Sequence, residues 1–134
     1  MVPMIELIQQ IIMADPFLSG IKGIEISDLG EGMIELDVPL QENILRTGGI
    51  MHGGAIMTLL DAAGGLSILT LGNLVNQVTI NLNTNFVRPV SAGPVKVRSR
   101  VVKSGKNISF CNIELRNGNG EICATASGSW FVFR

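Results

Sequence analysis

Asp61 is the residue of this 134-residue sequence whose position most clearly calls for a chemical explanation. It lies in the run LLDAA, inside a long apolar segment and too far from that segment's start to cap a helix. An ionised carboxylate in apolar surroundings costs free energy unless it is paired or hydrogen-bonded. One explanation is a general base or nucleophile that faces a substrate channel. The other is a carboxylate at a subunit interface, bound to a backbone amide or an arginine.

His52-Gly53-Gly54 lies at the start of the same segment, with His52 nine residues before Asp61. Unpaired amides at a helix N-terminus favour developing negative charge, and glycine lets a substrate carbonyl approach them. This is what an oxyanion site needs. The alternative is a loop-to-helix corner whose histidine is hydrogen-bonded to the main chain. Asp61 lies about two turns inside the helix, so two packed subunits could supply the amide and the carboxylate from different chains.

Gly64 and Gly65 are unexpected inside a helix, because each costs ~1 kcal/mol relative to alanine. The close approach of another helix or of a ligand would explain them, and so would tight packing within the chain.

Two helices are predicted to position these residues. Residues 53–70 are apolar on nearly every side, and a helix of this kind is expected to be buried all round. Gly72-Asn73 provides its end. Residues 4–14 predict a short amphipathic helix that ends at Asp15-Pro16.

Most of the remaining segments alternate apolar and polar residues, which is typical of strands with one buried face. Residues 24–27 and 34–38 predict a hairpin with its turn at residues 28–30, followed by an irregular loop over residues 40–52. Four further strands are predicted at residues 78–86, 95–101, 107–116 and 121–133, the last two joined by the turn sequence NGNG. The sequence therefore predicts one α+β domain over residues 1–134, with an antiparallel sheet of five to six strands curled around one long central helix.

The composition excludes several classes of protein. Apolar residues make up 46% and charged residues 16%, which is too apolar for a disordered chain. The net charge of −1 gives no reason to expect binding to nucleic acid or an anionic membrane. No run is long enough to span a bilayer, and the N-terminus lacks the features of a signal peptide. Cys111 and Cys123 are expected to be buried free thiols, no metal site is expected, and the cytoplasm is the expected compartment.

Residues 49–61 (GIMHGGAIMTLLD) resemble the signature of the phenylacetate-degradation (PaaI-type) hotdog thioesterases. Residues 83–89 (NTNFVRP), 101–106 (VVKSGK) and 120–128 (GEICATASG) look like later strands and turns of that family. The resemblance extends over about residues 20–132. It implies the hotdog fold, in which a curled sheet wraps a central helix, and hydrolysis of an acyl- or aryl-acyl-CoA to a free acid and CoA.

The resemblance also implies roles for individual residues. Asp61 would be the catalytic carboxylate, acting as general base on water or as nucleophile. The amide of Gly53 would bind the thioester oxygen, and His52 would orient the site. Thr79 lies where related enzymes often carry a serine or threonine that helps to place the water. The loop residues Thr47 and Gly48 would line the site, and Gly54 and Gly65 are also predicted to contact substrate.

One position departs from the family pattern. Many relatives carry an asparagine six residues before the histidine, where it helps to hold the attacking water. That position is Arg46 here, and Asn43 could substitute for it only if the loop bends. Arg46 is therefore predicted to lie at the substrate but not to repeat the role of the asparagine.

Binding of CoA would require cations for its phosphates. Arg88, Lys103 and Lys106 are candidates because they lie near strand ends. Lys96, Arg98 and Arg100 alternate along one strand and are equally well explained as a solvated face.

The leading hypothesis is an acyl-CoA thioesterase that needs no cofactor. A non-catalytic protein that binds or senses acyl-CoA is the alternative, because fold does not fix function. A hydratase of the same fold is disfavoured, because its acid usually precedes the histidine. Family resemblance and exposed sheet edges predict a homo-oligomer, a dimer of dimers with sites at the dimer interface.

Overall fold

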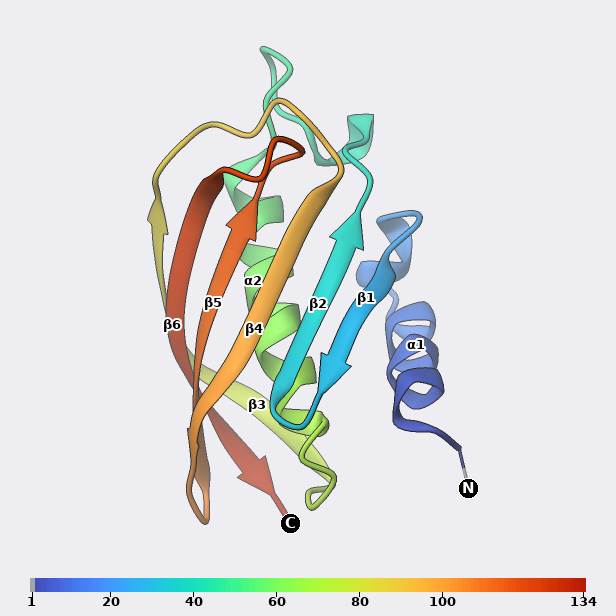
Figure 1. Cartoon of the computed structure of the whole chain (residues 1–134), viewed down its shortest axis with the longest axis vertical. Coiled ribbons are helices and arrows are strands. Elements are labelled where there is room, and N and C mark those ends of the chain that lie inside the picture. Colours follow the sequence, from blue (N-terminus) through green and yellow to red (C-terminus); the bar gives the residue numbers. More distant parts are fainter. Residues whose placement is uncertain (1) are drawn as a thin grey trace.

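The computed structural model describes residues 2–134, which form one antiparallel sheet, two α-helices and two short 3-10 turns (Figure 1). The helices are α1 (Met4–Ala14) and α2 (Gly53–Leu69), with 3-10 turns at Leu18–Gly20 and Glu42–Ile44. The strands are β1 (Glu25–Gly30), β2 (Met33–Val38), β3 (Asn76–Phe86), β4 (Val95–Ser104), β5 (Ile108–Arg116) and β6 (Ile122–Phe133). The predicted α+β class and chain order are confirmed.

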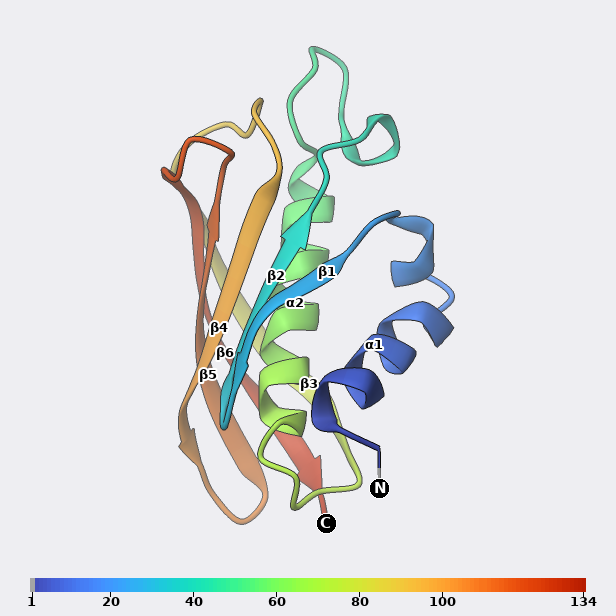
Figure 2. The ribbon, with the colours of Figure 1, turned by 45° about the vertical axis from the view of Figure 1, so that its right-hand side comes forward.

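The six strands form a single sheet in the order β1-β2-β4-β5-β6-β3, and every neighbouring pair is antiparallel. The chain therefore places β3 beside β6 at one edge of the sheet and leaves β1 at the other edge. The sheet curves around α2, which lies along its concave face (Figure 2). This is the predicted arrangement of a curled sheet and one long helix.

The first hairpin differs from its prediction. The turn is at Glu31-Gly32 and not at residues 28–30, because Asp28 pairs with Glu35 and continues β1. A β-bulge between Ile26 and Asp28 shifts the alternation of inward and outward side chains by one residue. The apolar–polar alternation in the sequence therefore stops before the strand does, and pairing with β2 continues to Gly30. Gly32 supplies the positive φ of 75° that the turn needs.

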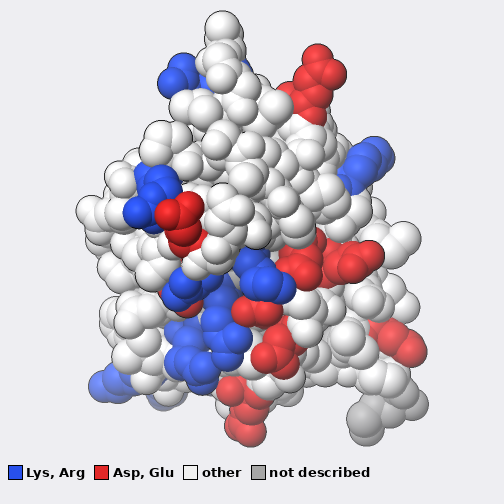
Figure 3. Space-filling view, turned by 45° about the horizontal axis from the view of Figure 1, so that its top comes forward, with Lys and Arg blue, Asp and Glu red and all other residues white. Residues whose placement is uncertain are grey.

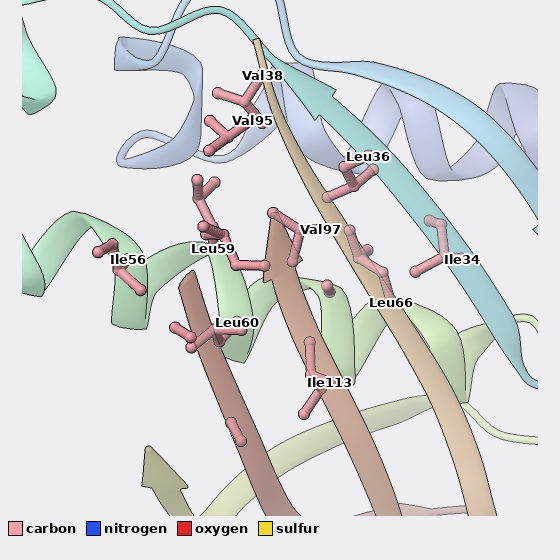
Figure 4. Close-up of a cluster of buried hydrophobic side chains, with 14 of the residues drawn as sticks. Ile34, Leu36, Val38, Ile56, Leu59, Leu60, Leu66, Val95, Val97 and Ile113 are labelled. Carbon is pink, nitrogen blue, oxygen red and sulfur yellow. The ribbon is translucent and has the colours of Figure 1, made fainter. Parts of the chain in front are cut away.

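The core lies between α2 and the inner face of the sheet (Figure 4). Leu59 and Leu60 of α2 are fully buried against the sheet, whose inner face carries a row of aliphatic residues from each central strand. Each such side chain contributes ~1.5–3 kcal/mol by leaving water. The fully buried sheet residues include Ile34, Leu36, Val38, Val95, Val97 and Leu115.

The sheet covers only one side of α2. A strip along the opposite side stays partly or fully exposed, made of Gly54, Met57, Thr58 and Asp61. These residues recur at intervals of three or four, so they share one helix face. The expectation that this helix is buried all round is wrong for the single chain, and the exposed strip is the one that carries the carboxylate.

The outer face of the sheet carries charges of both signs next to one another (Figure 3). Lys96 pairs with Asp37 at 2.8 Å, and Arg98 pairs with Glu35 at 3.1 Å. The neighbouring acidic groups raise the pKa of Lys96, and the hydrogen bond that Lys96 donates to Asp37 is the largest cause. Lys96 and Arg98 therefore form ion pairs on the outer face of the sheet, and Arg100 beside them is exposed. Residues 2–134 contain no helix with the length and apolarity needed to cross a membrane.

Candidate active site

Asp61 lies at the middle of α2, where it faces the first half of the edge strand β3. The Thr79 hydroxyl donates a hydrogen bond of 2.6 Å to Asp61 Oδ1. Thr79 belongs to the inner face of β3, since it pairs with the buried Trp130 of β6. None of the ion pairs formed within residues 2–134 involves Asp61. The carboxylate is therefore oriented by a neutral donor and keeps an oxygen for other partners.

A cleft of about 710 Å³ opens beside Asp61. α1 forms one of its walls, and α2 and the start of β3 form the others. Most of its lining is apolar, with Thr58, Asp61, Gln77 and Thr79 among the polar exceptions. Such a cleft can hold an apolar group with its reactive end at the carboxylate.

His52 caps the N-terminus of α2. Its Nδ1 accepts a hydrogen bond of 2.9 Å from the Gly54 amide, so a neutral imidazole carries its proton on Nε2. Within residues 2–134 the Gly53 amide has no hydrogen-bond partner, as expected for the first residue of a helix. His52 thus bonds to the main chain, as the second interpretation of this corner predicted, and it leaves the Gly53 amide available to an anion.

The Gly53 amide and the Asp61 carboxylate belong to two separate hollows of the chain. Gly53 lines a hollow of about 280 Å³ with Phe86 and Arg88, at the far end of β3. Asp61 is eight residues after Gly53 on the same helix, which corresponds to a rise of about 12 Å. A single thioester group is much smaller than this, so one chain does not bring both groups to one reacting carbon.

The loop before α2 lies away from Asp61. Arg46, Thr47 and Gly48 are all exposed, and Arg46 donates to the Thr47 carbonyl at 3.2 Å. None of the three lines the cleft beside Asp61. Gly48 has a φ of 98°, a backbone conformation that favours glycine. Within the single chain these predicted contact residues are not brought to the carboxylate.

Asn43, the suggested substitute for the family's asparagine, is held by its own contact. Its side-chain amide donates to the Gly20 carbonyl at 2.7 Å. It lines a hollow of about 520 Å³ together with His52 and Gly54. The loop therefore brings Asn43 to the helix N-terminus and not to Asp61 of the same chain.

The predicted phosphate contacts lie at opposite ends of the sheet. Arg88 follows β3, where it donates to the Ile122 carbonyl at 2.8 Å and lies 3.6 Å from Glu121. Lys103 is near the end of β4, and Lys106 is in the turn between β4 and β5, at the bottom of Figure 1. These three cations do not form one patch within a chain.

The two helix glycines have different neighbours. A Cβ at Gly64 would lie 2.4 Å from the Cη2 and Cζ2 atoms of Trp130, so Gly64 allows the indole to pack on the helix. A Cβ at Gly65 would lie 2.4 Å from Nε2 of Gln77. Gly65 is covered by Gln77 and does not itself line the cleft. Tight packing within the chain accounts for Gly64.

The sequence analysis missed Gln77 and the contribution of α1. The predicted strand begins at residue 78, one residue after Gln77, whereas β3 begins at Asn76. Strand alternation places Gln77 on the same face as Thr79, so an earlier start would have identified it. No pattern in residues 4–14 indicates which side of that helix lines a cleft, because this depends on how the helix packs.

Comparison with known proteins places the chain in a family. The profile described as "Thioesterase superfamily" matches residues 48–124, which include α2, β3, β4 and β5. The chain belongs to the thioesterase superfamily. Both the helix with Asp61 and the strand with Thr79 lie inside the matched region.

Individual relatives agree with this assignment. The protein named "Putative esterase Ta0293" from Thermoplasma acidophilum is 46% identical over 127 residues, covering 95% of this chain and 96% of the relative. The crystal structure of thioesterase HI1161 from Haemophilus influenzae has a TM-score of 0.86 at 28% identity, covering 100% of this chain and 92% of that one. A hypothetical thioesterase from Streptococcus pneumoniae, solved with coenzyme A, shares the fold with a TM-score of 0.78 at 24% identity, covering 86% and 89% of the two chains. The family match and the first two proteins support thioester hydrolysis as the activity of this superfamily member, and the third shares the fold.

Proposed function

We propose that the protein hydrolyses acyl-CoA thioesters, with Asp61 as the general base or nucleophile. The observation that carries the proposal is an Asp61 carboxylate oriented by Thr79 at 2.6 Å beside a largely apolar cleft. The same helix presents the Gly53 amide, which has no hydrogen-bond partner among residues 2–134. A base or nucleophile and an oxyanion donor are the two groups that acyl transfer needs.

The chemistry follows from these two groups. Water adds to the thioester carbonyl carbon while Asp61 takes its proton, and the carbonyl oxygen gains negative charge at the Gly53 amide. The C–S bond then breaks, and the CoA thiolate leaves with the proton that Asp61 returns. In the covalent alternative, Asp61 attacks the same carbon, expels the thiolate and forms a mixed anhydride that water hydrolyses. The geometry is compatible with both routes.

The distance of about 12 Å between the two groups means that a complete site takes them from two chains. The edge strand β3 is the surface that would join them. It exposes apolar side chains, with Val78 49% and Ile80 52% exposed, and edge strands of this kind are usually paired or covered. Antiparallel pairing of two β3 strands about a two-fold axis would bring the Gly53 end of each chain to Asp61 of the other.

The same pairing would assemble the predicted phosphate contacts. Arg88 at one end of β3 would approach the Lys103 and Lys106 end of the second copy. The presence of coenzyme A in a structure of the same fold supports CoA as the leaving group. A basic site made only in the dimer fits an oligomeric enzyme, and the dimer of dimers and cytoplasmic location stay predictions.

The proposed acyl group is an apolar aryl or alkyl group. The PaaI-type resemblance favours an aryl-acyl group, and the apolar cleft accepts an aryl or alkyl group equally well. If the protein bound acyl-CoA tightly but did not hydrolyse it, that result would support the alternative function, a non-catalytic acyl-CoA binding or sensing protein.

The test is thiol release from a panel of acyl- and aryl-acyl-CoA esters, measured for the wild type and three variants. Asp61→Asn should lose about 10²–10⁴-fold in kcat, the usual contribution of a general base. Gly53→Pro removes the amide proton at a helix position where proline is well accepted, and should lose about 10²–10³-fold. Gly53→Ala is its matched control, because its Cβ would contact Phe86 at an ordinary 3.7 Å and the amide is kept. Asp61→Asn that releases CoA as fast as the wild type would end the proposal.

A further inference from the structure

The cleft beside Asp61 selects for uncharged groups. Its walls are formed by apolar side chains of α1, of the end of α2 and of β6, among them Met4, Leu7, Leu66, Leu69 and Trp130. Among residues 2–134 no lysine or arginine lines it. The Asp15 carboxylate at its rim already accepts hydrogen bonds of 2.9 Å from the amides of Phe17 and Leu18. An acyl group that ended in a second carboxylate would lose its hydration here without gaining a cation.

Gln77 is one of the polar residues on the wall of this cleft. Its side chain lies across α2 at Gly65, where a Cβ would stand 2.4 Å from Nε2, 2.9 Å from Cδ and 3.1 Å from Oε1. Any residue other than glycine would displace the carboxamide. The missing side chain of Gly65 thus leaves the space that the Gln77 carboxamide occupies, which we call its seat, although Gly65 does not line the cleft itself.

The Gln77 carboxamide has hydrogen-bonding capacity to spare. It offers two donors and an acceptor, and within residues 2–134 none of these side-chain atoms makes a hydrogen bond. The bond between Gln77 and Asn76 Oδ1 comes from the Gln77 backbone amide. The side chain is half-buried. A partly buried amide without protein partners is a hydrogen-bonding group available to whatever fills the cleft.

The position of Gln77 relative to Asp61 fixes which part of a substrate it meets. Gly65 is one helical turn beyond Asp61, a rise of about 6 Å. Gln77 is two residues before Thr79 on the same face of β3, about 6.6 Å along the strand. For an acyl chain that runs parallel to this wall from a carbonyl at Asp61, the backbone spacing puts Gln77 about 6 Å further along the chain, or about five bonds at ~1.25 Å of advance per bond.

We propose that Gln77, seated on Gly65, is a specificity-determining residue that hydrogen-bonds an uncharged oxygen of the acyl group about five bonds from the thioester carbonyl. This inference rests on the proposed thioesterase function, since it assigns the acyl end of the same site. The substrate class is then an apolar acyl-CoA with one hydroxyl or keto oxygen at that distance.

The experiment compares kcat/KM for 5-hydroxyhexanoyl-CoA, 3-hydroxyhexanoyl-CoA and hexanoyl-CoA. The wild type should favour the 5-hydroxy compound over hexanoyl-CoA by roughly three- to tenfold, the value of one neutral hydrogen bond. The 3-hydroxy compound, whose oxygen does not reach Gln77, should show no such preference. In Gln77→Leu the ratio of kcat/KM for 5-hydroxyhexanoyl-CoA to that for hexanoyl-CoA should fall close to one. Gln10→Leu, an exposed glutamine on α1, is the matched control and should keep the wild-type ratio.

Gly65→Ala provides an independent variant that leaves Gln77 in the sequence. Its methyl group should push the carboxamide from its seat and reduce the 5-hydroxy preference as Gln77→Leu does. The double variant should lose no more than either single variant, because both remove the same contact. An unchanged ratio in Gln77→Leu, with hydrolysis otherwise intact, overturns this inference alone. Failure of the wild type to hydrolyse any of a broad panel of thioesters overturns the proposed function and this inference together.

Discussion

Gly64 and Gly65 are adjacent helix glycines for which the structure predicts opposite responses to alanine. At Gly64 the new Cβ would lie 2.4 Å from two atoms of the Trp130 ring, against an ordinary carbon contact of about 3.5–4.0 Å. The ring cannot retreat, because Trp130 is fully buried and lies 2.8 Å from the place where a Cβ on Gly128 would stand. Either the ring or α2 must therefore move by more than about 1 Å.

The magnitude follows from two opposing effects. Overpacking of this kind costs ~1–3 kcal/mol, and the trapped ring places Gly64→Ala at the upper end. Alanine recovers ~1 kcal/mol of helix propensity, which leaves a net loss of ~2 kcal/mol. For a chain of this length that loss lowers Tm by about 6–8 °C. Gly65→Ala meets only the flexible end of Gln77, so its stability should be unchanged or raised by up to ~1 kcal/mol.

Thermal unfolding followed by circular dichroism, at one protein concentration for the wild type and both variants, measures this difference. A fixed concentration matters because assembly contributes to Tm. If Gly64→Ala melted at or above the wild type, or if Gly65→Ala lost as much as Gly64→Ala, this explanation of the two glycines would be refuted.

Thr79→Val should lower kcat/KM about tenfold, because it removes the hydrogen bond to the Asp61 carboxylate. Such a bond is worth ~1.5–3 kcal/mol, and the lower end applies because this one is partly exposed. Thr79→Ser keeps the hydroxyl and should stay within threefold of the wild type. Burial is the largest cause of the raised pKa of the Cys111 and Cys123 thiols, so both should remain protonated and unreactive toward an aromatic disulfide reagent at pH 8 in the native protein. In guanidinium chloride both thiols should react, and rapid native labelling would contradict their burial. Ionisation of these thiols in the unfolded chain alone should also make the free energy of unfolding fall as pH rises through 9. Ile80→Lys at the β3 edge should reduce the mass measured by sedimentation and lower kcat/KM by more than tenfold, whereas Val102→Lys, an equally exposed change on β4, should do neither.

The fold was largely predictable because its information is local. The alternation in residues 95–101 and 107–116 and the mostly apolar run after residue 52 each identify an element without knowledge of its neighbours. The predictions were wrong where the apolar–polar alternation of a segment does not match its hydrogen-bonded strand pairing. The bulge after Ile26 carried β1 past the predicted turn, and the start of β3 at Asn76 was hidden by polar residues.

The site was predictable only in part, because it depends on contacts between distant segments. Asp61 was identified by its unsuitable surroundings, and Thr79 by family resemblance, and the structure brings the two together at 2.6 Å. Spacing alone did not reveal that the Gly54 amide is occupied by His52. It also could not show that Gln77 reaches over Gly65, because that contact depends on how β3 packs against α2.

The central claim is that one chain supplies Asp61 and a second supplies the Gly53 amide. Mixing the inactive variants Asp61→Asn and Gly53→Pro under conditions that exchange subunits tests it directly. Random exchange makes half of the dimers mixed, and each mixed dimer contains one complete site and one doubly defective site. The mixture should therefore recover about one quarter of the wild-type rate of CoA release. A mixture that exchanges subunits and stays as inactive as its two components would contradict the shared site.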